Sequence, residues 1–275
     1  MRPIKTLLAR SNDTRKLLLA SRPNLNNFGV LCKELVLTGV RGRSSAYSFD
    51  SHPLKISRNG LSFYVGSLAD GRTLVSNFEK ALEQALRSSL AGPDCVFIDV
   101  GANFGCWTIR AASMGANVIA IEPDPRNLSL LRRNIEFNKL AGKITVAPGC
   151  AGETSGTREF AREEYGRKST LLDYKDAQPG NYKDTIVVKC YYLDEFLAQI
   201  EALNPSRVLM KVDVEGAEAE VLGGAQALIE RLSPVIIFEA LSGDALRRAK
   251  ETIAENNPSY VVRALDKTNY IAQPE

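Results

Sequence analysis

The feature that most constrains the fold is an alternation of short apolar runs with amphipathic stretches from Cys95 to the C-terminus. The stretches between the runs carry apolar residues at helical spacing. One has a clear helical start, because Asp124 can cap it and Pro125 suits its first position. We therefore predict an α/β fold, a parallel sheet with helices on both faces. The expected strands are residues 95–98, 118–121, 144–147, 185–190, 208–212, 235–238, 261–265 and 270–272, and the expected helices are residues 104–113, 125–140, 193–203, 217–231 and 245–255.

The first 76 residues do not follow this pattern. They are rich in Arg, Ser, Asn and Gly, and their strand-like pieces are short. We interpret residues 1–76 as a helical or irregular N-terminal extension, and residues 77–275 as one domain that a helix at 77–90 opens. At the very start, basic residues surround a set of leucines. We expect a solvated or partner-packed helix there, with contact to an anionic membrane surface or a transit-peptide role as the alternatives.

Composition and charge bound the function classes. With 44% hydrophobic and 24% charged residues the chain has globular composition, and a net charge of +3 does not predict a nucleic-acid partner. The five cysteines form no CxxC pair, which favours reduced thiols in the cytoplasm. No apolar run reaches the roughly 20 residues that span a bilayer. A single histidine, His52, excludes a multi-histidine metal site and disfavours a histidine general base. The oligomeric state stays open.

A glycine-containing loop follows the first strand of the alternation. Asp99 ends the strand, and the chain turns through Gly101 and Gly105 into a helix, so that small residues and helix amides face a ligand. Two of the three glycines that a G-x-G-x-x-G dinucleotide loop requires are absent. Glu122 ends the next strand about 20 residues later, where a carboxylate can accept the hydroxyls of a ribose. Loop and acid together predict an adenosine-bearing ligand. A plain tight turn with a strand-capping glutamate is the alternative.

A second motif lies at the end of the strand at 208–212, which the topology makes central. Period-two alternation puts Lys211, Asp213 and Glu215 on one side of the chain. Charges in a central strand must be paired or lie at its carboxyl end, facing the ligand crevice. Glu239 ends the following apolar strand and is expected beside them. The alternative is a buried ion pair between Lys211 and Asp213 that only organises the core.

These pieces occur in one order along the chain, and together they resemble the FkbM family of methyltransferases. The resemblance rests on Asp99-Val-Gly-Ala-Asn-Phe-Gly, Glu122-Pro, Lys211-Val-Asp-Val-Glu-Gly-Ala-Glu, Val221-Leu-Gly-Gly-Ala and Phe238-Glu, within roughly residues 77–240. It implies a class I methyltransferase (Rossmann-like) fold with a mostly parallel seven-stranded sheet. It also implies S-adenosylmethionine as methyl donor, and O-methylation of a hydroxyl on a sugar, glycan or secondary metabolite.

The resemblance also implies which residues hold the cofactor. By position, the loop from Asp99 to Gly105 would hold the methionine end and Glu122 the ribose. The adenine would lie after the third strand, near Ala151, although the usual acidic partner of its amino group is missing there. The candidate cofactor-binding residues are Asp99, Gly101, Ala102, Asn103, Gly105, Glu122, Pro123 and Ala151.

The candidate catalytic residues follow from the chemistry of methyl transfer. A sugar hydroxyl is a poor nucleophile until its proton is taken, so we predict that Asp213, with Glu239, accepts or directs that proton. Lys211 would fix the Asp213 carboxylate and tune its pKa, and Glu215 completes the set. In a variant of this mechanism the carboxylates hold Mg²⁺, which polarises the acceptor oxygen. No residue is assigned as the ligand of a resident metal.

Two other functions stay open. One is methylation of RNA or another nucleic acid, which predicts a basic groove with aromatic residues. The other is a non-catalytic protein that binds S-adenosylmethionine, because a fold alone does not establish turnover. Trp107 is expected to line the cofactor pocket or to pack on the sheet. Aromatic faces for a sugar ring are expected from the tyrosines at 165, 174, 182, 191 and 192, or these are ordinary surface residues.

Overall fold

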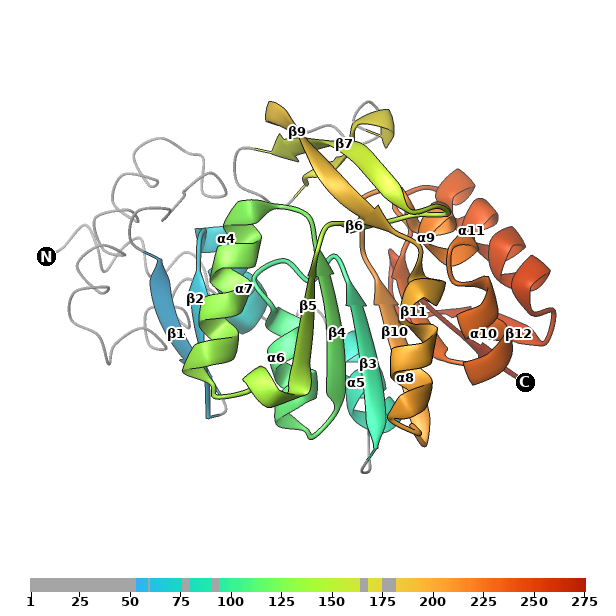
Figure 1. The fold of residues 1–275 in the computed structure, drawn as a ribbon, viewed down its shortest axis with the longest axis horizontal. Coiled ribbons are helices and arrows are strands. Elements are labelled where there is room, and N and C mark those ends of the chain that lie inside the picture. The colour runs from blue at the N-terminus through green and yellow to red at the C-terminus, as the bar shows by residue number, and fades with distance from the viewer. Residues whose placement is uncertain (1–52, 59, 76–79, 91–93, 164–167, 175–181) are drawn as a thin grey trace, which may run out of the picture.

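The computed structural model describes residues 53–58, 60–75, 80–90, 94–163, 168–174 and 182–275 (Figure 1). The basic N-terminal segment, His52 and Tyr165 lie outside these ranges. Within them, no helix is long and apolar enough to cross a membrane.

A seven-stranded sheet forms the centre of the molecule, in the order β12-β13-β11-β10-β3-β4-β5. Only β13 runs antiparallel to its neighbours. This confirms the predicted class I fold with a mostly parallel seven-stranded sheet. The strands are β3 (Cys95–Val100), β4 (Asn117–Glu122), β5 (Ile144–Pro148), β10 (Arg207–Val212), β11 (Val235–Glu239), β12 (Tyr260–Ala264) and β13 (Asn269–Pro274).

Helices cover both faces of this sheet because alternate strand residues point to opposite sides. Phe97 and Leu209 join a core with α5, α6 and α7, whereas Ile98 and Met210 join a core with the C-terminal helices. The first face carries α5 (Lys80–Ser89), α6 (Cys106–Ser113) and α7 (Pro125–Phe137), with the 3₁₀ turn η1 (Ala141–Lys143) following. The second carries η3 (Leu193–Phe196), α8 (Leu197–Ala202), α9 (Glu218–Gly223), α10 (Gln226–Leu232) and α11 (Gly243–Asn256).

The predicted start of α7 is confirmed. The Asp124 carboxylate accepts a hydrogen bond from the Arg126 amide at 2.9 Å, and Pro125 is the first residue of the helix. The helix ends at Phe137 rather than near residue 140, because Lys139 adopts a φ of 58° and turns the chain toward β5. The single helix expected at 217–231 is two helices, α9 and α10.

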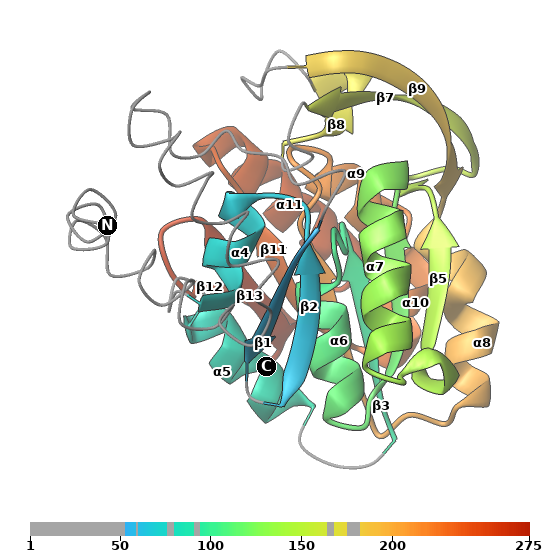
Figure 2. The same cartoon turned by 90° about the vertical axis from the view of Figure 1, so that its left-hand side faces the viewer.

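A second, four-stranded sheet lies over the carboxyl ends of the main strands, at the top of Figures 1 and 2. We call it the small sheet. It contains β6 (Cys150–Ala151), β7 (Gly156–Glu163), β8 (Thr170–Leu171) and β9 (Tyr182–Tyr191), with the 3₁₀ turn η2 (Leu172–Tyr174) after β8. The strand expected at 185–190 is thus part of β9 and lies outside the main sheet. The charged stretch that precedes it contains a strand, β7, that pairs with β9 over eight residue pairs.

The described residues before position 77 fold against the main domain. They form a hairpin of β1 (Leu54–Arg58) and β2 (Leu61–Val65), with β2 beside α6 and α7, and the helix α4 (Leu68–Val75), which packs on the hairpin (Figure 2). Buried Asn134 of α7 joins the two parts: its amide donates to the carbonyl oxygens of Tyr64 and Phe104 and accepts from the Tyr64 amide. The boundary of the extension at residue 76 stays a prediction. Its part from Leu54 onward is regular and shares the core of the domain.

Candidate active site

The site lies where the strand order reverses, between the carboxyl ends of β3 and β10, the position at which open α/β sheets bind ligands. The loop after β3 is held tightly there. The Gly101 amide donates to the Ile121 carbonyl at 3.0 Å, and Gly101 has a φ of +80°. A Cβ on Gly101 would lie 1.9 Å from the carbonyl oxygen of Asp213. Glycine is therefore required at 101 by the approach of the neighbouring strand's backbone.

Glu122 is hydrogen-bonded to this loop. Its carboxylate accepts from the Asn103 amide at 2.7 Å and the Asp124 amide at 2.8 Å, and from the Asn127 side chain at 3.3 Å. Asn103 has a φ of +53°, which turns its amide toward the acid. Burial raises the pKa of Glu122 to about 7, although the two amide hydrogen bonds lower it. The loop and the acid predicted from the sequence are thus in direct contact.

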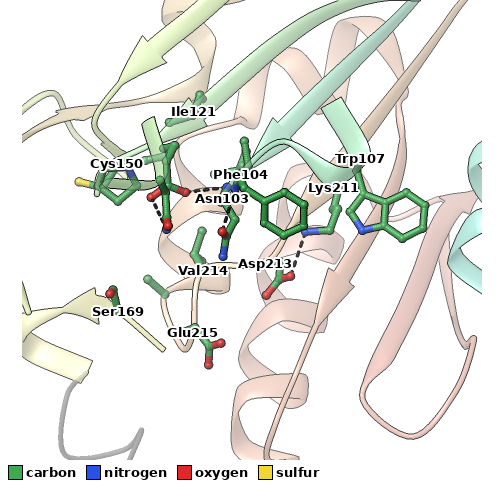
Figure 3. A pocket seen from close by; sticks show the side chains of 18 of the residues that line it. Asn103, Phe104, Trp107, Ile121, Cys150, Ser169, Lys211, Asp213, Val214 and Glu215 are labelled. Atoms are coloured by element: carbon green, nitrogen blue, oxygen red, sulfur yellow. Dashed lines mark hydrogen bonds and ion pairs between the residues drawn. The ribbon is translucent and has the colours of Figure 1, made fainter. Parts of the chain in front are cut away.

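A cavity of about 200 Å³ opens beside this contact (Figure 3). Ten of the twelve candidate residues line it, and they come from the ends of β3, β4, β6, β10 and β11. These ten are Gly101, Ala102, Asn103, Glu122, Pro123, Ala151, Lys211, Asp213, Glu215 and Glu239. Asp99 and Gly105 do not line it. Gly105 instead packs on α7, since a Cβ there would lie 2.5 Å from Leu131 Cδ1.

Asp99 lies in the wall behind the loop and is buried. Thr108 donates to its Oδ2 at 2.5 Å, whereas its Oδ1 is buried and accepts no hydrogen bond from any described residue. Burial raises the pKa of Asp99, and the Lys211 ammonium, on the register-paired residue of β10, opposes that shift. A buried carboxylate oxygen without a donor suits a ligand that brings one.

The ion pair considered in the sequence analysis is present. Lys211 Nζ lies 2.9 Å from Asp213 Oδ2, and the side chains of Lys211 and Asp213 are 6% and 36% exposed. Lys211 is thus buried while Asp213 reaches the cavity, as Figure 3 shows. The pair lies at the carboxyl end of β10, and a ligand in the cavity can contact it through the Asp213 carboxylate.

Three carboxylates gather around this pair. Oxygen atoms of Asp213, Glu215 and Glu239 all lie within 4.8 Å of one another, and all three side chains are half-buried. Burial, followed by the negative charges of Asp213 and Glu215, raises the pKa of Glu239 to about 8. Glu239 therefore holds a proton at neutral pH. We call these three residues the carboxylate cluster. Its oxygen atoms are close enough to share one cation.

A comparison with protein families identifies the family of the chain. The model of the methyltransferase FkbM domain matches residues 99–256, more than half of the chain and all four candidate catalytic residues. The chain belongs to the FkbM methyltransferase family.

Curated relatives of this FkbM protein include a methyltransferase 1 from Beauveria bassiana, 28% identical over 48% of this chain, and the hexuronic acid methyltransferase AglP from Haloferax volcanii, 29% identical over 54%. The chain spans 58% and 56% of these relatives' own lengths. Among solved structures, the FkbM methyltransferase from Methylobacillus flagellatus KT has a TM-score of 0.48 and 17% identity, over 96% of this chain and 58% of that one.

Several residues of the FkbM site escaped the sequence analysis. Asp70 and Thr73 of α4 line the cavity, and so do Phe160, Ser169 and Leu171 of the small sheet. Nothing in the sequence marks these residues, because they reach the cavity only through the docking of separate segments. Asn127 is another lining residue that the sequence analysis did not name. Its position could have been inferred, because it lies in the first turn of α7, close after Glu122, to which it donates a hydrogen bond.

The aromatic residues divide differently from the expectation. Trp107 is buried in the core and also lines the cavity, next to Phe104 in Figure 3, so both interpretations hold. None of the four described tyrosines lines the cavity. Tyr174 instead donates a hydrogen bond to Glu220 at 2.5 Å. The small sheet contributes Phe160 and Leu171, rather than tyrosines, to the wall of the cavity.

Proposed function

We propose that this FkbM protein transfers a methyl group from S-adenosylmethionine to a hydroxyl of a sugar, glycan or secondary metabolite. The observation that carries the proposal is the continuity of one cavity, which joins the Glu122 loop to the carboxylate cluster. The first can hold an adenosine-bearing donor, and the second can take a proton from an acceptor. The relative AglP is a hexuronic acid methyltransferase, which supports a sugar acceptor.

The residues fit the proposed cofactor. Glu122 Oε1 accepts from the Asp124 amide and the Asn127 side chain, whereas Oε2 accepts from the Asn103 amide and retains a lone pair for a ribose hydroxyl. The orphaned Oδ1 of Asp99, behind the loop, is an acceptor that the ammonium of the methionine end would reach through a water. Ala151 and Cys150 line the cavity after β5, where the adenine would lie. When bound, the cofactor supplies a methyl group on a positively charged sulfur.

The protein then has to align the acceptor and handle one proton. Asp213 is the proposed acceptor of the hydroxyl proton, since it reaches the cavity and its other oxygen is fixed by Lys211 at 2.9 Å. Protonated Glu239 can donate a hydrogen bond to the acceptor and so orient it. Glu215 supplies a further acceptor at the same point. Phe160 and Leu171 of the small sheet line the cavity and reduce the access of water to the reacting groups.

The test is a screen of glycans, free sugars and lipids with methyl-labelled cofactor, followed by Asp213→Asn on any acceptor found. We expect Asp213→Asn to lower turnover about 10²–10⁴-fold, the range for loss of a positioned base. The affinity for cofactor, measured by isothermal titration calorimetry, should change little. Turnover near the wild-type rate in Asp213→Asn would refute the assignment.

A second route uses Mg²⁺ on the same three carboxylates, and their spacing is the observation that favours it. The two routes differ in one measurement: added EDTA abolishes the metal route, and Mg²⁺ restores it. Activity that persists in EDTA excludes the metal route and leaves proton transfer to the carboxylates.

Two further candidates use the same fold. Ribosomal protein L11 methyltransferases, such as that of Desulfitobacterium hafniense at 29% identity over 34% of this chain, are also relatives, so protein and RNA acceptors belong in the screen. A non-catalytic role is the remaining candidate. Cofactor binding without methyl transfer to any acceptor class would favour it.

A further inference from the structure

The turn between Asp213 and Glu218 has an unusual backbone. Glu215 has a φ of +57° and Gly216 a φ of +116°, two successive residues in the region that glycine prefers. For glutamate this conformation is unfavourable, because its Cβ crowds the backbone carbonyl. Such a conformation persists only where the surrounding structure holds it. It brings the Glu215 carboxylate into the carboxylate cluster.

Buried Glu218 holds the turn from within its own segment. Its Oε1 accepts from the Gly216 amide at 3.1 Å and from the Val214 amide at 3.4 Å. The two amides on either side of Glu215 therefore end on one carboxylate oxygen. A carboxylate that accepts these two bonds holds the Asp213–Val214 and Glu215–Gly216 peptides, and so restrains the turn before and after the strained residue.

Thr170 holds the same turn from the small sheet. It is fully buried in β8, and its Oγ1 donates to the Glu215 carbonyl oxygen at 2.9 Å. The next residues reinforce the contact: a Cβ on Gly216 would lie 3.3 Å from the ring of Tyr174, whose hydroxyl bonds to Glu220. Arg158 of β7 also bonds to Glu220, at 2.9 Å. The small sheet is thus docked on the segment that carries the cluster.

We propose that Thr170 and Glu218 are positioning residues that together hold Glu215 in its left-handed conformation and so keep the three carboxylates of the cluster together. The proposal rests on the proposed function, since it assigns these residues to the same site. Neither side chain lines the cavity, so neither is a catalytic residue. The role of this part of the small sheet is local: Ser169, which lines the cavity, precedes the residue that holds Glu215.

The test compares Thr170→Val, which keeps the shape and loses the hydroxyl, with Thr170→Ser, which keeps the hydroxyl. Thr157→Val is the matched control, because Thr157 is exposed on β7 of the same sheet. Amide hydrogen exchange of Val214 and Gly216 is measured in each protein. We expect Thr170→Val to accelerate it about fivefold to tenfold, the effect of losing one hydrogen bond. Thr170→Ser and Thr157→Val should exchange at the wild-type rate.

On an acceptor that the wild type methylates, Thr170→Val should lower kcat with little change in KM or in cofactor affinity, and Thr170→Ser should restore kcat. Unchanged exchange in Thr170→Val would overturn the proposal, and so would faster exchange with unchanged kcat. Should Thr170→Val not fold, Glu218→Gln and Glu218→Ala replace it. Glutamine keeps an acceptor for both amides, so Glu218→Gln should exchange near the wild-type rate, whereas Glu218→Ala should exchange faster. Equal exchange rates in Glu218→Gln and Glu218→Ala would also overturn the proposal. The exchange measurement needs no acceptor, so an inactive wild type refutes the proposed function alone.

Discussion

Glu122 gives the most direct prediction, because one buried carboxylate connects the cofactor loop to pH. Burial raises its pKa to about 7. Above pH 7 the group is ionised and can accept a hydrogen bond from a ribose hydroxyl, whereas below pH 7 it carries a proton and loses acceptor capacity. We therefore expect the affinity for S-adenosylmethionine to fall as the pH falls through 7.

The magnitude follows from the ionised fraction. With a pKa of about 7, Glu122 is roughly nine-tenths ionised at pH 8 and one-tenth ionised at pH 6. If only the ionised form binds well, the apparent Kd rises about tenfold between these values, or about 1.4 kcal/mol. Isothermal titration calorimetry at half-unit intervals from pH 6 to pH 8.5 measures the change.

Glu122→Gln is the control. The amine of the cofactor itself titrates in the upper part of this range, near the ordinary pKa of an α-amino group, and so does Glu239. Both effects occur in the variant as well. The difference between wild type and Glu122→Gln therefore isolates Glu122. A difference that is constant from pH 6 to pH 8.5, or that grows toward low pH, would refute the assignment of the ribose to this carboxylate.

Two further predictions concern stability, measured by urea unfolding. Gly101→Ala should destabilise the protein by more than about 3 kcal/mol, because its Cβ would overlap the Asp213 carbonyl oxygen, or should prevent folding. Gly115→Ala is its control: Gly115 also has a positive φ but has open space around it, so about 1–2 kcal/mol of backbone strain is expected. Equal costs for the two would contradict the close approach of β3 and β10. Asn134→Ala should cost about 3 kcal/mol, since it leaves buried backbone groups of the hairpin and the loop without partners. Asn138→Ala, at the less buried end of the same helix, should cost about 1 kcal/mol. A small effect of Asn134→Ala would show that the hairpin folds separately from the domain.

The parts of the site that lie at strand ends could be predicted from the sequence. Parallel strands bring their carboxyl ends to one edge, so Glu122, Asp213 and Glu239 had to come together once their strands were recognised. The glycine-containing loop from Asp99 to Gly105 was also recognised because it directly follows a predicted strand. Its glycines were attributed to a ligand, whereas the structure shows that protein atoms already require them: the Asp213 carbonyl at Gly101 and the Leu131 side chain at Gly105.

Parts of the site that depend on docking could not be predicted. Asp70 reaches the cavity because α4 packs on the hairpin and the hairpin packs on α6 and α7, and Ser169 reaches it because the small sheet covers the strand ends. No local pattern encodes either contact, since each joins segments far apart in the chain. The same holds for Thr170, whose hydroxyl acts on Glu215 across 45 positions of sequence.

The sequence by itself determined the alternation of strands and helices, and through it the order of acidic strand ends around one crevice. It also determined that a lysine and three acids would meet there. Only the tertiary structure decided their state: burial and mutual repulsion leave Glu239 protonated at neutral pH, while Lys211 is buried against Asp213. Proton affinity depends on distance and on access to water, and a sequence contains neither until the chain has folded.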